Sequence, residues 1–151
     1  MSEKRNVIAE IEAAYKEMAS AVDGVPAGRM AEAFLDQWSA KDLLAHTASW
    51  AEFTVNDFQR IARGHMPCLV AFKESEVNDW NAFFMTPRKV FPLDQVTFEY
   101  EHWHRALLDL LKGLPDPVFG PGVLANVCVI LHSHLREHAG NIRAWREREG
   151  I

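Results

Sequence analysis

The sequence predicts an all-α protein, a four-helix bundle. Four long segments repeat apolar residues at intervals of three and four, the spacing of a helix with one buried face. Glycine and proline separate these segments, and no stretch shows the alternation of a half-buried strand. The predicted helices are residues 2–22, 40–62, 94–112 and 123–149.

Composition is typical of a globular protein, with 48% hydrophobic and 25% charged residues in 151 positions. This length suits one domain, residues 1–151, that buries a single core. The net charge of −5 disfavours nucleic acid as a partner. We expect a cytoplasmic protein, because the chain has no signal-like segment, no run that could cross a membrane and only two unpaired cysteines, Cys68 and Cys128.

The first two helices have clear boundaries. The first carries one apolar stripe and ends at the breakers of residues 23–28. Ser39 precedes the second helix and Asp42 is its third residue, which predicts an N-cap close to a capping box. Gly64 ends the second helix.

The pattern weakens between residues 65 and 91, where a shorter helix at Glu74–Phe84 is expected. A long aromatic connection between two helices is either a lid over the core or one wall of a ligand pocket. It also indicates a crossover and not simple up-down wiring.

The third and fourth long helices carry the remaining apolar stripes. Asp94 is the expected N-cap of the third, His102 should face solvent and His104 should lie at the margin of the buried face. On the fourth helix the inward residues are expected to be Leu124, Val127, Leu131, Leu135, Ile142 and Trp145.

His134 and His138 lie on that same face of the fourth helix, because residues four apart stand one above the other. Such a pair is either a helical metal chelate or two hydrogen-bonded core histidines. His46, in the first turns of the second helix, is the candidate third ligand. Three imidazoles leave coordination positions open, as in a catalytic site, and suit zinc, nickel or iron.

Two motifs resemble those of the DinB/YfiT-like superfamily. Residues 38–50 read WSAKDLLAHTASW, similar to the opening of the second helix there, and residues 134–145 read HLREHAGNIRAW, similar to its closing motif. Within that superfamily the chain looks most like the ClbS/DfsB family. The motifs cover about a sixth of the chain, but their order and separation agree over nearly all of it.

The resemblance implies a bundle with up-down-down-up helices and a long crossover between helices two and three. It also implies a metal triad of His46, His134 and His138, and reactions that use metal-bound water or a low-molecular-weight thiol. Relatives often have Tyr where this chain has Leu135. Tyr15 and Tyr100 are the residues that could supply that hydroxyl.

The expected function is a metal-dependent hydrolase or thiol transferase that acts on an electrophilic small molecule, as in ClbS-like resistance or detoxification. Glu137 and Asp57 are candidate proton carriers, with a solvent-exposed carboxylate as the alternative for each. One rival is a bundle that sequesters a small molecule between Trp50, Phe53, Trp80 and Trp103. The other is a protein-interaction module with a vestigial metal site. A homodimer is compatible with all three.

Overall fold

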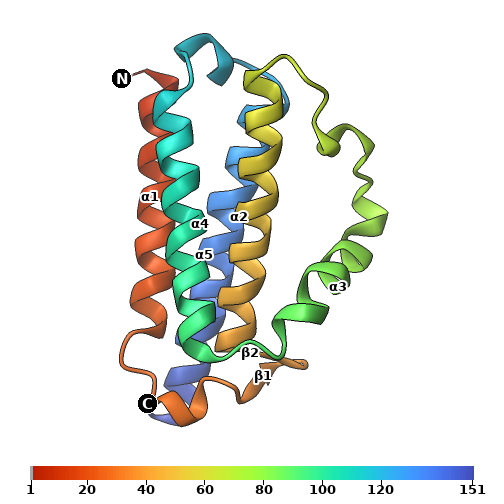
Figure 1. Cartoon of the computed structure of the whole chain (residues 1–151). Coiled ribbons are helices and arrows are strands. Elements are labelled where there is room, and N and C mark those ends of the chain that lie inside the picture. Colours follow the sequence, from red (N-terminus) through yellow and green to blue (C-terminus); the bar gives the residue numbers. More distant parts are fainter. Residues whose placement is uncertain (1) are drawn as a thin grey trace.

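The computed structural model describes residues 2–151 and confirms the all-α bundle. Its four long helices are α1 (Glu3–Val22), α2 (Ala40–Ala62), α4 (Leu93–Gly113) and α5 (Val123–Glu149). Figure 1 shows α1 and α5 running in one direction and α2 and α4 in the other, the expected up-down-down-up order. α1 packs along α5 and α2 packs along α4, whereas α2 and α5 meet over a much shorter stretch.

The crossover between α2 and α4 contains η2 (Cys68–Ala71), η3 (Glu74–Glu76) and α3 (Val77–Arg88). The short helix therefore forms about where the sequence predicts it, and it packs against α2 beside the bundle (Figure 1). Arg88 fastens its end, because the guanidinium binds Glu52 of α2 and lies 3.7 Å from Glu99 of α4.

A two-stranded ribbon precedes α2, so the prediction that the chain has no strands is wrong. β1 (Ala33–Leu35) and β2 (Trp38–Ser39) pair antiparallel. The turn between them places Asp36 at φ 52°, a left-handed conformation that Asp tolerates better than most residues. Strands this short are too brief to show alternation in the sequence. The ribbon covers the end of the bundle by stacking Phe34 on Trp145.

Helix starts agree with the sequence at α2 and differ at α4. Ser39 and Asp42 form the full capping box, since each side chain accepts a hydrogen bond from the other residue's backbone N–H. α4 instead begins at Leu93 after Pro92, and Asp94 lies within its first turn. Pro92 is the N-cap residue of α4, so Asp94 lies inside the helix and does not cap it.

Two apolar clusters fill the bundle, one around Leu43 and Trp145 and one around Phe58 and Leu111. His104 is fully buried between them and not marginal, because its Nδ1 donates to the Tyr100 carbonyl and its ring stacks on Tyr15. On α5, Cys128 is fully buried, whereas Val127 and Leu131 are only half-buried. His102 is exposed, as predicted.

Within residues 2–151, none of the helices combines the length and the hydropathy needed to traverse a membrane.

Candidate metal site

Three histidines from two helices converge where α2 and α5 meet. The capping box fixes the start of α2 and places His46 in its second turn, while His134 and His138 lie one turn apart on α5. The Nε2 atom of His134 is 2.8 Å from Nε2 of His46 and 2.8 Å from Nε2 of His138. The ligand atoms of all three rings lie within 4.8 Å of one another.

The site is enclosed on the side of the β ribbon. The Trp38 ring meets the His46 ring edge-on at 4.6 Å between centroids. Burial, together with the neighbouring histidines, lowers the pKa of His46 to about 2. Burial and His134 lower the pKa of His138 to about 3, and burial also lowers the pKa of His134. All three rings are therefore neutral at physiological pH, the form in which imidazole binds metal.

The donor set fits a divalent cation. A neutral imidazole carries one N–H, so three Nε2 atoms that face one another cannot all be satisfied by mutual hydrogen bonds. When Nε2 supplies a lone pair, the ring proton lies on Nδ1. The Nδ1 atoms of His46 and His138 are buried and have no hydrogen-bond partner within residues 2–151. A cation between the rings would use all three lone pairs and leave room for a further ligand.

An aromatic wall begins one turn from the triad. Trp50 follows His46 by four residues, so the two side chains share one side of α2. The Trp50 ring packs against Phe53, Phe72 and Phe84, and Trp80 of α3 packs against the same three phenylalanines. The indole Nε1 of Trp50 donates to Asn81 at 2.8 Å. Trp103 is not part of this wall and packs against the core cluster around Phe58 and Leu111.

Asp57 does not join the histidines. It stands eleven residues after His46, about 16 Å along the helix, and its carboxylate accepts from the backbone N–H groups of Cys68 and Leu69 at 2.8 Å and pairs with Arg60. The side chain is fully buried, so the alternative of an exposed carboxylate is wrong. Asp57 fastens the start of the crossover, which sequence spacing did not reveal.

Glu137 is exposed on α5 beside the site, and its charge raises the pKa of His134 against the larger lowering by burial. Leu135 is buried in the core, and the Tyr100 hydroxyl donates to the Tyr15 carbonyl at 3.0 Å.

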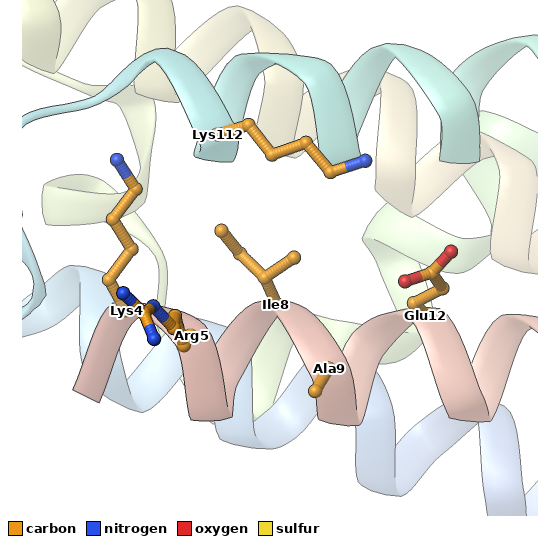
Figure 2. Close-up of a pocket in the computed structure, with 6 residues that line it drawn as sticks. All are labelled: Lys4, Arg5, Ile8, Ala9, Glu12 and Lys112. Atoms are coloured by element: carbon orange, nitrogen blue, oxygen red, sulfur yellow. The ribbon is translucent and has the colours of Figure 1, made fainter. Parts of the chain in front are cut away.

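A separate hollow lies between α1 and α4, away from the histidines. Figure 2 shows Lys112 of α4 facing α1 across this hollow, with Ile8 pointing into it. The hollow is open to solvent and Lys4 already donates to the Leu114 carbonyl. It holds none of the predicted site residues.

No protein-family model matches the sequence, and no curated protein matches it significantly. Solved structures do match. An uncharacterised protein of Escherichia coli UTI89 superposes with a TM-score of 0.84 at 14% identity over 98% of this chain and 95% of that one. The structure described as "Sibling Lethal Factor Precursor - DfsB" gives 0.79 at 14% identity, covering 97% and 96%.

A third structure, from Streptococcus pneumoniae, gives a TM-score of 0.79 at 13% identity over 97% of this chain and 92% of that one. At such identities the likeness establishes the fold alone. The chain therefore has the fold of DfsB, as its two motifs predict.

Proposed function

We propose that His46, His134 and His138 bind one divalent metal ion and that the site activates water or a thiol toward an electrophilic small molecule. The observation that carries the proposal is the convergence of three neutral imidazoles, through their Nε2 atoms, from two helices. Zinc, nickel and iron are the ions that suit such ligands.

A bound ion of this kind lowers the pKa of a coordinated water or thiol and so supplies a nucleophile near neutral pH. The residues around the histidines supply an apolar surface, shielding from water and a proton acceptor. Trp50 and its aromatic neighbours offer an apolar surface for a substrate, and Trp38 shields one side of His46 from water. Glu137 is the exposed carboxylate that can accept the proton lost by the nucleophile. Asp57 acts only as a positioning residue, through its hold on the crossover.

The reaction is an addition or substitution at an electrophilic carbon. The oxygen or sulfur of the nucleophile forms a bond to that carbon, and the bond from the carbon to its leaving group breaks, with the electron pair remaining on the leaving group. The proton that Glu137 accepts from the nucleophile is then given to that leaving group. Hydrolysis and thiol transfer both have this balance, and both detoxify reactive compounds. The ClbS-like motifs at residues 38–50 and 134–145 support this class of reaction.

Metal binding is tested on untagged, metal-stripped protein. Ion at a hundredfold above its Kd should stabilise the fold by about 2.7 kcal/mol and raise the Tm by several degrees. His138→Ala should remove most of this gain, because α5 then has no chelating pair. His132→Ala is the matched control, since His132 lies about 160° around the helix from His134. A Tm that stays unchanged when zinc, nickel or iron is added would refute the metal site.

Turnover is tested separately with chromogenic probes. Metal-loaded protein should hydrolyse nitrophenyl acetate or couple chlorodinitrobenzene to a low-molecular-weight thiol, and His134→Ala should not. Stoichiometric probe binding without turnover would favour the sequestering bundle. Metal binding with neither probe binding nor turnover would contradict the enzyme and favour the interaction module.

A further inference from the structure

A second hollow lies on α3, the helix that stands beside the bundle in Figure 1. It has a volume of about 420 Å³, is open to solvent and is lined by Glu76, Asp79, Trp80 and Phe83. Phe83 falls between Asp79 and Trp80 around the helix, because a residue three or four positions further on returns to the same side. The hollow therefore combines two carboxylates with two aromatic rings. We call it the α3 hollow.

The two rings of the α3 hollow differ in how firmly they are held. Trp80 packs against Phe53, Phe72 and Phe84, with ring centroids 5.5 Å, 6.3 Å and 6.0 Å away. Phe83 meets only the edge of this group, at 5.9 Å from Phe84, and is 72% exposed. Trp80 thus offers a fixed ring, and Phe83 adds apolar surface that the core does not use.

The charge around the α3 hollow is negative. Residues 74–87 contain three carboxylates and no Lys, Arg or His. Lys73 lies 3.8 Å from Glu76, whereas Asp79 forms no ion pair within residues 2–151. The helix dipole accounts for an acidic residue in the first turn of α3. It does not account for the exposed phenylalanine beside that carboxylate.

Aromatic rings and carboxylates share one preference, which is for a cation. The face of an indole or phenyl ring carries negative charge and attracts an ammonium group, and a neighbouring carboxylate adds to that attraction. A small ammonium ion is strongly hydrated, whereas an alkylated one spreads its charge over methyl groups that can contact ring faces. Four lining residues are also too few for a protein partner, which needs about 20 on each side.

We propose that the α3 hollow binds a small organic cation that carries an alkylated ammonium group. The aromatic rings of Trp80 and Phe83 would contact its methyl groups, and Asp79 would balance its charge. None of the three histidines lines this hollow. The inference therefore stands apart from the proposed metal site.

The test titrates choline chloride into metal-stripped protein at constant ionic strength and follows the indole N–H signal of Trp80 by NMR. Phe83→Ala should weaken choline binding about two- to fivefold, the size of a cation–π contact at an exposed site. Asp79→Asn should also weaken it, because the balancing charge is lost. The uncharged carbon isostere of choline, dimethylbutanol, should bind more weakly than choline.

Matched controls lie on α4. Phe98 is 65% exposed and Asp109 is exposed, so Phe98→Ala and Asp109→Asn make the same changes away from the hollow and should leave the affinity for choline unchanged. His134→Ala should bind choline as the wild type does, whatever the metal test shows. An unchanged Tm in Phe83→Ala would show that its loss of affinity does not come from unfolding.

Four outcomes would overturn the inference. They are no saturable binding of choline, equal affinity for choline and dimethylbutanol, equal losses in Phe83→Ala and Phe98→Ala, and binding to phosphatidylcholine vesicles without binding of free choline. The last would assign the α3 hollow to a lipid surface and not to a small cation.

Discussion

The two halves of α5 contrast in charge and in the kind of side chain that they expose. Residues 123–135 carry no charged side chain, yet Ile130 is 65% exposed. Residues 136–149 carry many charges, yet Ile142 is completely buried. Both halves bury residues in the bundle, but only the second half covers its exposed side with charged residues. The uncharged half leaves apolar surface unused, and His134 and His138 stand at the boundary between the two.

The contrast teaches that exposed apolar residues here are not a failure of packing. The second half of α5 is fixed to α1, because Arg136 pairs with Glu10 and Glu17 and Arg146 binds the carbonyls of Ala21 and Asp23. Both halves contribute to the core, since Leu124 and Cys128 of the first half and Ile142 and Trp145 of the second are buried. The halves therefore differ in their anchoring ion pairs and in the side chains that they expose.

The largest expected difference compares the same substitution in both halves. Ile142→Ala should lower the free energy of unfolding by about 2–5 kcal/mol, since it opens a cavity in the core. Ile130→Ala should change it by less than about 0.5 kcal/mol, as at other surface positions. Urea denaturation measures both, and equal losses would show that the halves do not differ as described.

Arg146→Ala tests the anchorage of the second half. The guanidinium donates to two carbonyls at the end of α1 and to Ile151, and hydrogen bonds from a charged group contribute about 1–3 kcal/mol. We expect a loss of that size in thermal or urea unfolding. Asn126→Ala in the first half should leave the free energy of unfolding nearly unchanged. A loss there as large as that in Arg146→Ala would contradict the difference in anchoring between the two halves.

Acid should destabilise the metal-stripped protein through the histidines of the candidate metal site. The folded-state pKa values of His46 and His138, about 2 and 3, lie below the ordinary 6.5. The unfolded chain therefore binds more protons as the pH falls below about 6.5, and stability is lost in that direction. Each ring should cost about 1–2 kcal/mol by pH 5.

Denaturation at a series of pH values measures this loss. His46→Gln should show a shallower decline below pH 6.5 than the wild type. A wild-type stability that stays constant down to pH 5 would mean that the rings are solvated and not enclosed.

Much of this arrangement follows from the sequence. Spacing alone predicts that His134 and His138 share a face, and the Ser39–Asp42 cap fixes the turn of α2 on which His46 lies. The structure brings the three rings together as that spacing indicates. Metal binding by them stays a prediction.

Other features depend on tertiary contacts that no local pattern records. Asp57 is buried because its carboxylate accepts from the backbone N–H groups of Cys68 and Leu69, which lie in η2 after α2 has ended. His104 is buried because Tyr15 of α1 covers it. The ribbon is held against the bundle because the Phe34 ring stacks on the ring of Trp145, which lies near the C-terminal end of the chain.

The smallest expected effect on stability is that of replacing Glu137, which lies between His134 and His138 on α5. Glu137→Gln removes a negative charge that raises the pKa of His134, so that pKa should fall further. NMR titration of the ring measures the shift. The free energy of unfolding should change by less than about 0.5 kcal/mol, because the side chain is exposed. A large loss of stability would show that Glu137 has a structural role.

The most direct test of the metal site is an anomalous difference map from crystals grown with zinc. We predict one peak at the boundary of the two halves of α5, about 2.0–2.1 Å from the Nε2 atoms of His46, His134 and His138. Crystals that contain zinc elsewhere, or none, with these three nitrogens still facing one another, would contradict the account.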